Sequence, residues 1–215
     1  MSVTSPDVRF WDRIARKYAT DPIKDLAGYE RTVARTRQLL DARATVLEIG
    51  CGTGTTALSL APSVSHIFAT DVSAEMIAIA QEKAASGTSK NVTFMVAPAS
   101  RDLGTEALYD AVLAFNVLHL IGDRAAALAQ ARRVLKPGGL LISKTPCLSE
   151  MNPFIRIAVP IARWLGKAPS VSFFDAATLE TEITRAGFTI IERARHGSGR
   201  NDPRIFLVAQ RTDAS

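Results

Sequence analysis

The sequence has little cysteine, since Cys51 and Cys147 are the two cysteines among its 215 residues. Two cysteines cannot form a disulfide framework, and their separation does not match the spacing of metal ligands. Such sparse use favours a reducing compartment. Histidine is scarce as well, and the three histidines lie far apart, at His66, His119 and His196. We therefore expect no metal site.

Long apolar runs are also absent. No uninterrupted apolar segment approaches the ~20 residues that cross a bilayer as a helix. The first residues, Met1 to Pro6, do not show a basic stretch followed by an apolar core, so we expect no signal peptide. Together these absences predict a cytoplasmic protein.

Charge of one sign is not gathered into a continuous run. The net charge is +5, but acidic residues interleave with most of the basic ones, which is typical of solvated helix faces. The sequence has no stripe of basic and aromatic residues, so we expect no nucleic-acid partner. With 47% hydrophobic and 22% charged residues, a chain of this length is predicted to form one α/β domain over residues 1–215.

The order of the predicted elements indicates the fold class. Residues 1–43 show helical periodicity and are predicted to form an N-terminal helical cap. The predicted strands are Thr45–Ile49, His66–Thr70, Val92–Val96, Ala111–Phe115, Leu140–Lys144, Phe188–Ala194 and Arg204–Gln210. The predicted helices between them are Thr55–Leu60, Ser73–Ala85, Arg124–Leu135 and Asp175–Ala186. Apolar strands in this alternation predict a parallel sheet covered by helices on both faces, and the final pair predicts one antiparallel strand.

The strongest site signal is the glycine-rich turn Gly50-Cys-Gly-Thr-Gly54, which follows a predicted strand and opens a predicted helix. Glycines there let backbone N–H groups approach a ligand, because no Cβ stands in the way. Asp71 ends the next strand, where a carboxylate can accept hydrogen bonds from both hydroxyls of a ribose. Glu48 precedes the turn. The spacing is G-x-G-x-G rather than the G-x-G-x-x-G of dinucleotide-binding proteins.

Several segments resemble those of class I S-adenosylmethionine-dependent methyltransferases, in the branch related to quinone-biosynthesis and phospholipid N-methyltransferases. The segments that carry the resemblance are Leu47–Gly54, Ala69–Ser73 with Met76, Phe115–His119, Leu135–Leu141 and Ala186–Phe188. The opening stretch Phe10–Tyr18 is similar to the helix that caps the cofactor in such enzymes. The resemblance implies a Rossmann-like fold with a seven-stranded, mostly parallel sheet, an antiparallel last strand and helices on both faces.

The resemblance also implies the cofactor S-adenosyl-L-methionine, with S-adenosyl-L-homocysteine as the product. Gly50, Gly52 and Gly54 would line the methionine half of the cofactor, and Asp71 would bind the ribose. The other positions implied to contact the cofactor are Tyr18, Glu48, Cys51, Thr55, Val72, Met76, Ala99, Ser100, Asn116 and Val117.

Four of these positions have implied roles of their own. Val72 and Met76 would pack on the adenine ring. The backbone at Asn116 would contact the methionine amino group, and Tyr18 would close over the carboxylate.

One position departs from the family's pattern. Relatives usually have an acidic residue just after the third strand that binds the adenine amino group, and Pro98 stands at that position here. Ser100, Asp102 or the backbone are the alternatives. For Asp71, the structural alternative is capping of the next helix, although Ser73 already suits that role.

Structural roles compete with functional ones at three further side chains. Tyr18 lies on an amphipathic helix, where simple packing would also account for an aromatic residue. Cys51 has no feature of a nucleophile and is interpreted as a small residue of the turn. His119 follows the fourth strand and is the candidate catalytic residue, because a histidine there could remove a proton from an acceptor near neutral pH. It could equally pack against the strand ends.

Residues 147–174 form an insertion that interrupts the alternation of strands and helices. Within 152–167 the polar or helix-kinking positions recur at steps of four, three and four, at Arg156, Pro160, Arg163 and Lys167. They share one narrow stripe, so a helix here is expected to bury most of its circumference. We predict a lid packed on the sheet edge above an apolar or amphipathic acceptor. An apolar wall for the acceptor, or a surface that makes peripheral contact with a membrane, are the alternatives.

The predicted function is methyl transfer by in-line displacement to an O, N or C nucleophile of a small-molecule or lipid-like acceptor. Two other classes stay open, a non-catalytic protein that binds S-adenosylmethionine and an NAD(P)-dependent oxidoreductase. For an oxidoreductase the third glycine comes one residue too early, and the sequence has no Tyr-x-x-x-Lys. The sequence does not fix the acceptor, the use of a general base or the oligomeric state.

Overall fold

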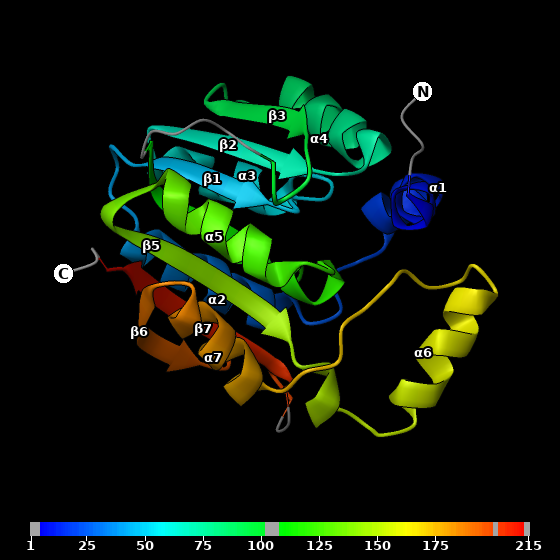
Figure 1. Cartoon of the computed structure of the whole chain (residues 1–215). Coiled ribbons are helices and arrows are strands. Elements are labelled where there is room, and N and C mark those ends of the chain that lie inside the picture. The colour runs from blue at the N-terminus through cyan, green and yellow to red at the C-terminus, as the bar shows by residue number, and fades with distance from the viewer. Residues whose placement is uncertain (1–4, 102–107, 200–201, 213–215) are drawn as a thin grey trace.

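A computed structural model describes residues 5–101, 108–199 and 202–212 (Figure 1). Two helices, α1 (Pro6–Thr20) and α2 (Leu26–Leu39), precede the first strand, as predicted. α1 begins after Ser5, whose hydroxyl accepts a hydrogen bond from the Val8 amide at 3.3 Å. Within the described residues, no helix combines the length and the hydropathy needed to cross a membrane.

Within the described part of the chain, seven strands form one sheet. They are β1 (Thr45–Ile49), β2 (His66–Asp71), β3 (Val92–Val96), β4 (Tyr109–Phe115), β5 (Leu135–Pro146), β6 (Phe188–Ala194) and β7 (Arg204–Arg211). Their order is β3-β2-β1-β4-β5-β7-β6, and β7 runs antiparallel to both of its neighbours while the pairs from β3 to β5 are parallel. The predicted Rossmann-like fold class is confirmed. The chain order reverses between β1 and β4, which is where open α/β sheets bind ligands.

β5 is longer than predicted. The sequence indicates a turn at Lys136–Gly139 and a strand from Leu140, whereas the strand begins at Leu135. Leu135 pairs with Tyr109 ahead of a register shift, and regular pairing resumes at Leu140. A bulge in the strand explains the difference, because the proline and glycines that predict a turn are also the residues that irregular pairing tolerates.

Helices cover both faces of the sheet. The α-helices after β1 are α3 (Thr55–Leu60), α4 (Ala74–Ser86), α5 (Arg124–Val134), α6 (Ile155–Trp164) and α7 (Ala176–Arg185), and the 3-10 helices are η1 (Ala61–Ser63), η2 (Leu118–Leu120) and η3 (Leu148–Glu150). α5 and α7 pack on one face through side chains such as Leu128 and Ile183. α2, α3 and α4 pack on the other through Val33, Leu60 and Ile77. The sheet is therefore buried on both faces, as its apolar strands require.

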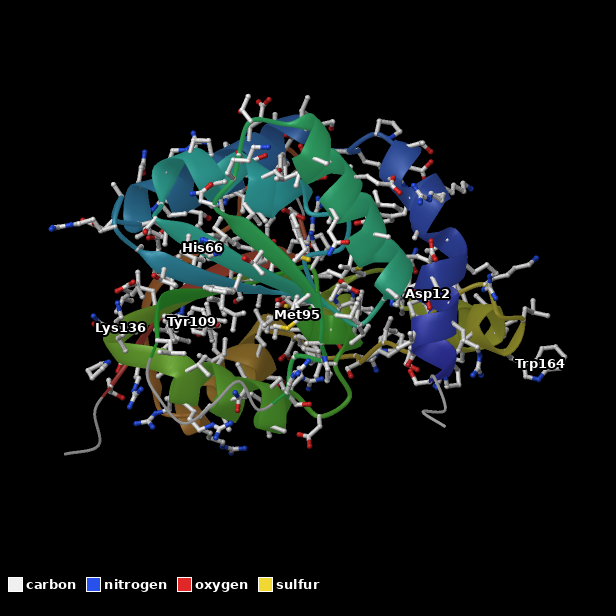
Figure 2. The ribbon with its side chains drawn as sticks, turned by 90° about the horizontal axis from the view of Figure 1, so that it is seen from above. Asp12, His66, Met95, Tyr109, Lys136 and Trp164 are labelled. Atoms are coloured by element: carbon white, nitrogen blue, oxygen red, sulfur yellow. The ribbon has the colours of Figure 1, made fainter. Side chains whose placement is uncertain are left out.

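α1 packs on α4 at the edge of the sheet rather than on the sheet itself (Figure 1). Ala15 of α1 and Met76 of α4 are fully buried at this contact, and Trp11 packs against them. The Asp12 carboxylate accepts a 2.6 Å hydrogen bond from the Ser73 hydroxyl, at the place where α1 meets α4 (Figure 2). The N-terminal helix is thereby fixed beside the loop that follows β2.

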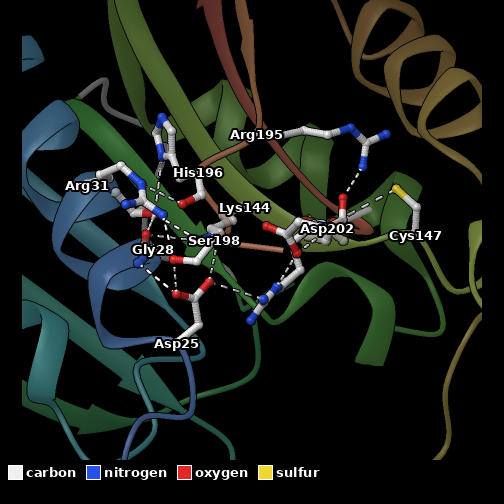
Figure 3. Close-up of polar contacts among 12 residues, drawn as sticks. Asp25, Gly28, Arg31, Lys144, Cys147, Arg195, His196, Ser198 and Asp202 are labelled. Carbon is white, nitrogen blue, oxygen red and sulfur yellow. Dashed lines mark hydrogen bonds and ion pairs between the residues drawn. The ribbon is translucent and has the colours of Figure 1, made fainter. Parts of the chain in front are cut away.

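A polar network joins α2 to β5 and to the loop between β6 and β7 (Figure 3). Lys144 is 6% exposed, and its ammonium group donates to the Thr32 hydroxyl at 2.9 Å. Asp25 accepts hydrogen bonds from the Gly28 amide and from both the amide and the hydroxyl of Ser198. These bonds hold the pKa of the Asp25 carboxyl well below its usual range. The network fixes α2 against the carboxyl end of β5.

α6 stands apart from the sheet (Figure 1), and the expectation that it buries most of its circumference is wrong. None of its residues, all of which the structure describes, is buried, and Trp164 is 85% exposed. The end of the helix is held beside α1 instead of over the sheet. The Arg13 guanidinium donates to the Gly166 carbonyl, and the Ser170 amide donates to the Asp7 carboxylate at 2.7 Å. These contacts draw the insertion toward α1 and leave its apolar side chains uncovered.

Candidate cofactor-binding site

The turn between β1 and α3 has the backbone conformation that its glycines predict. Gly50, Gly52 and Gly54 all have positive φ, at 66°, 53° and 74°. A side chain with a Cβ in this conformation costs roughly 1–2 kcal/mol, so glycine is strongly favoured at all three positions. The three glycines therefore favour the shape of the turn through their own backbone preferences.

The three glycines differ in what surrounds them. A Cβ on Gly50 would lie 2.3 Å from the Val117 side chain, and a Cβ on Gly54 would lie 2.8 Å from the ring of Phe94. A Cβ on Gly52 would meet none of the described residues within 4 Å. Gly50 and Gly54 thus serve close packing, whereas Gly52 leaves its bare main chain facing open space.

Asp71 lies opposite this bare main chain, at the end of β2. One carboxylate oxygen accepts from the Gly52 amide at 2.9 Å, and the other accepts from the Ser73 amide at 2.9 Å. Because each carboxylate oxygen has two lone pairs, both can still accept from a hydroxyl of a ligand. The Ser73 hydroxyl caps α4 by accepting from the Met76 amide at 3.1 Å, as predicted. Asp71 is therefore free of the capping role.

Glu48 is buried beneath the turn, with 3% of its surface exposed. Burial, together with the nearby charge of Asp71, raises the pKa of the Glu48 carboxyl to about 8. Among the described residues, its Oε2 atom has no hydrogen-bond partner. The carboxyl group is thus protonated at neutral pH and has a polar atom that is not committed within the protein.

The raised pKa of Glu48 predicts a pH dependence of stability. In the unfolded chain the carboxyl loses its proton near its ordinary pKa of 4.5, while in the folded protein its pKa is about 8. The associated stability is therefore complete below pH 4.5 and falls as pH rises to about 8, by up to about 1.4 kcal/mol per pH unit. Glu48→Gln should remove this slope in denaturant unfolding. An unchanged slope in the variant would show that another group causes it.

The end of β4 forms the opposite side of the turn. Asn116 has a positive φ of 53°, and its amide donates to the Lys144 carbonyl at 2.7 Å. Val117, the next residue, packs against Gly50. A non-glycine residue in this conformation is uncommon, although asparagine adopts it more readily than most, and such residues cluster at functional sites. The carboxyl ends of β1 and β4, between which the strand order reverses, therefore meet at the glycine turn.

His119 lies on η2, close to the same strand end. Burial lowers the pKa of its imidazole to about 4, so the ring is neutral near pH 7. Its Nδ1 atom is buried and has no partner among the described residues. The His119 carbonyl accepts from the Ser172 amide at 2.8 Å, which brings the end of the insertion beside it. A neutral imidazole whose Nδ1 atom has no partner is able to accept a hydrogen bond there in one of its tautomers.

Tyr18 is half-exposed near the open side of this site. Its ring makes an edge contact with Trp11, with 6.2 Å between the ring centroids. Burial and the charge of Asp71 raise the pKa of the Tyr18 phenol. Tyr18 thus packs on Trp11 of its own helix and also lines the cleft between α1 and the end of α6.

The residues predicted to surround the adenine differ in how far they are exposed. Val72 follows Asp71 and exposes 37% of its surface, as a flat apolar contact requires, whereas Met76 is 2% exposed and packs between α1 and α4. Ala99 is half-buried and Ser100 is exposed in the turn after β3. Asp102, one of the alternatives to the missing acidic residue, lies outside the described residues.

Two residues whose side chains support this site, Lys83 and Asp12, were not predicted from the sequence. The Lys83 ammonium group donates to the hydroxyls of Thr53 and Thr55, at 2.9 and 3.1 Å, and so ties the glycine turn to α4. Asp12 binds the loop after Asp71 from α1. Asp12 lies inside the segment that resembles a cofactor cap, which is the signal that could have identified it, whereas nothing in the sequence links Lys83 to the turn.

The residues present fit S-adenosylmethionine. Gly52 offers unobstructed main chain, Asp71 keeps acceptor sites for two ribose hydroxyls, and Val72 offers an exposed apolar surface beside them. The unpartnered Oε2 atom of Glu48 adds a polar atom under the turn. Cys51 and Thr55, predicted at the same turn, are buried and exposed respectively.

Comparison with known proteins agrees with this assignment. A family described as a methyltransferase domain matches residues 46–139, which include the glycine turn, Asp71 and the end of β4. The demethylmenaquinone methyltransferase of Lactococcus lactis is 28% identical over 179 residues, an alignment covering 72% of this chain and 69% of that protein. These similarities support the interpretation of the chain as a class I S-adenosylmethionine-dependent methyltransferase.

Other similar proteins differ widely in size. The hybrid PKS-NRPS synthetase mpsA of Macrophomina phaseolina is 30% identical over 187 residues, which cover 80% of this chain but 5% of the synthetase. The chain thus spans a small part of several of the curated relatives that it matches. An S-adenosylmethionine-dependent methyltransferase from Mesorhizobium loti has a similar fold, with a TM-score of 0.67 and 19% identity, covering 83% of this chain and 96% of that one.

Proposed function

We propose that this protein transfers a methyl group from S-adenosylmethionine to an O, N or C nucleophile of a small-molecule or lipid-like acceptor, leaving S-adenosylhomocysteine. The observation that carries the proposal is the bare main chain at Gly52 opposite the Asp71 carboxylate, whose two oxygens each keep an acceptor site. This pairing suits a ligand in which a ribose, bound by Asp71, is joined to a slender chain that passes along the main chain of Gly52.

The family resemblance assigns the cofactor positions, and the geometry of the turn supports them. Asp71 accepts from the two ribose hydroxyls, and Val72 packs on the adenine ring. The turn from Gly50 to Gly54 follows the methionine half, and the backbone at Asn116 contacts its amino group. Residues 1–43 act as a cap, in which the phenol of Tyr18 closes over the carboxylate.

The bound cofactor would supply an electrophilic methyl group, so the protein has to align the acceptor and exclude water. Orientation of the two reactants alone can lower the activation free energy of a transfer reaction by ~7–11 kcal/mol. A dyad of acid and base is therefore not required. His119 is the candidate to accept a hydrogen bond or the proton of the acceptor, because its imidazole is neutral near pH 7 and its Nδ1 atom is not committed within the described residues. The same burial lowers its pKa to about 4 and makes it a weak base, so the positioning of the acceptor carries more of the proposal than proton removal does.

An apolar or amphipathic acceptor is the favoured class. The name of the Lactococcus lactis relative gives demethylmenaquinone as the substrate of that protein. In this chain the insertion next to His119 is apolar, and its helix α6 exposes large apolar side chains beside α1. An acceptor with an apolar portion could bind against such a surface while its nucleophile reaches the strand ends.

Calorimetry with S-adenosylmethionine and S-adenosylhomocysteine tests the proposal, and we expect a single site for each. Incubation with apolar candidate acceptors should release S-adenosylhomocysteine, detected by mass spectrometry. His119→Gln should lower the turnover rate and leave the binding heat unchanged. Binding without turnover for any acceptor would favour a non-catalytic binding protein. A folded protein that binds neither compound, or that binds NAD(P)H instead, would contradict the proposal.

A further inference from the structure

α6 presents one continuous apolar face to solvent. Its large apolar residues recur at steps of three, four, three and one, which places them on one side of the helix. The residues of this face, which we term the α6 apolar face, are Phe154, Ile157, Ile161, Trp164 and Leu165, and each exposes between 53% and 85% of its surface. Figure 2 shows Trp164 at the outer edge of the molecule. Exposed apolar residues gathered in this way mark an interaction surface.

The charge around this face has one sign. Residues 151–174 contain Arg156, Arg163 and Lys167 and include neither aspartate nor glutamate. Elsewhere in the sequence, acidic residues interleave with most of the basic ones. A short helix with Trp, Phe and Leu on one face and cations on the other is typical of helices that lie in the interface of a membrane.

A cleft of about 500 Å³ extends the same surface between α1 and the end of α6. Its cationic side chains are Arg13 and Lys17 from α1 and Lys167 from the insertion, opposed by the single acidic residue Asp21. Its apolar lining includes Phe10, Ile14 and Leu165. Leu165 belongs to both the cleft and the α6 apolar face, so the two are continuous.

We propose that the α6 apolar face and the cleft beside α1 dock this protein on an anionic lipid surface. The apolar face enters the boundary between head groups and acyl chains, and the cations of the insertion and of α1 pair with lipid phosphates. α1 and α6 both lie on the side toward which the parallel strands end (Figure 1). Docking therefore turns the cofactor site toward the lipid surface.

The other possible occupants of this face fit less well. A second copy would bring two cationic segments together, and the repulsion between like charges would oppose the contact. Closure of α6 over the sheet would have to break the contacts of Gly166 and Ser170 with α1. An anionic lipid surface instead matches both the charge and the apolar character of the face.

Vesicle binding tests the proposal without cofactor or acceptor, so it is independent of methyl transfer. The protein should bind phosphatidylglycerol vesicles and bind phosphatidylcholine vesicles far more weakly, with a blue shift of tryptophan emission that Trp164→Phe removes. The triple variant Arg156→Gln, Arg163→Gln, Lys167→Gln should bind about 100-fold more weakly, because each cation near an anionic leaflet contributes roughly fivefold. Added salt should weaken wild-type binding.

Matched variants control for surface change as such. Phe154→Ser with Trp164→Ser should reduce binding by at least about tenfold, whereas Ile191→Ser, which alters a 52% exposed residue on β6, should leave it unchanged. Arg43→Gln, at a highly exposed arginine outside the insertion, is the control for charge. Circular dichroism confirms that each variant is folded. Equal binding to both vesicle types, or a dimer in solution that dissociates on Trp164→Ser, would overturn the proposal.

Discussion

Asp71→Asn should weaken S-adenosylmethionine binding about 100-fold while the protein stays folded. The asparagine keeps one oxygen, but its amide group would turn a donor toward the amide of Gly52 or Ser73, and one acceptor site for the ribose would be lost. A hydrogen bond to a charged group contributes about 1.5–3 kcal/mol, so loss of one bond and disturbance of the other accounts for a change of this size. Calorimetry measures the affinity directly.

Asp110→Asn is the matched control for this prediction. Asp110 also accepts from a backbone amide, that of Thr45 at 2.8 Å, but it lies at the start of β4, at the opposite end of the parallel strands. Its replacement should leave the affinity for S-adenosylmethionine unchanged. If Asp71→Asn bound the cofactor as tightly as the wild type, the ribose would have to be held elsewhere.

Alanine substitutions in the glycine turn should separate stability from binding. Gly50→Ala combines the cost of a positive φ with a Cβ 2.3 Å from Val117, so we expect a loss of about 3 kcal/mol in the free energy of unfolding. Gly52→Ala should cost about 1–2 kcal/mol, because its Cβ enters open space. Its methyl group would, however, occupy the open space beside the Gly52 main chain where the cofactor is proposed to bind. The loss in binding free energy for S-adenosylmethionine should therefore exceed the loss in the free energy of unfolding.

Denaturant unfolding and calorimetry on the same variants measure the two effects. The double variant Gly50→Ala with Val117→Ala should recover only part of the stability lost in Gly50→Ala. The 2.3 Å contact with a Val117 methyl group is removed, but the Val117 Cβ atom still lies 2.7 Å away and the strain of the positive φ remains. A Gly52→Ala protein that binds S-adenosylmethionine as the wild type does would place the cofactor away from this turn.

Most of the fold could be predicted because its signals are local. Buried parallel strands are continuous apolar runs, and the structure has strands at each predicted position, with β6 at the predicted Phe188–Ala194. The starts of helices could be predicted from their N-cap residues, as at Ser73 before α4. β5 was harder, because Pro137 and the glycines after it are compatible with both a turn and a bulge, and only the neighbouring strand decides between them.

The helix of the insertion could not be placed from its sequence. Its periodicity gives an amphipathic helix but does not say which surface covers the apolar side. Contacts at Gly166 and Ser170 with α1, residues more than 150 positions away, hold the helix clear of the sheet. The expected burial was therefore wrong, although the helix itself lies at Ile155–Trp164, within the predicted range.

The sequence by itself determined the glycine turn, the acidic residue after the second strand and the alternation of strands and helices, because each depends on residues that are close in the chain. The tertiary structure decided which glycine stays open, that Asp12 and Lys83 support the site, and that α6 faces solvent. These features depend on distances between segments that are far apart in the sequence. Contacts between such segments form only when the chain folds and the sheet brings the ends of β1, β2 and β4 together.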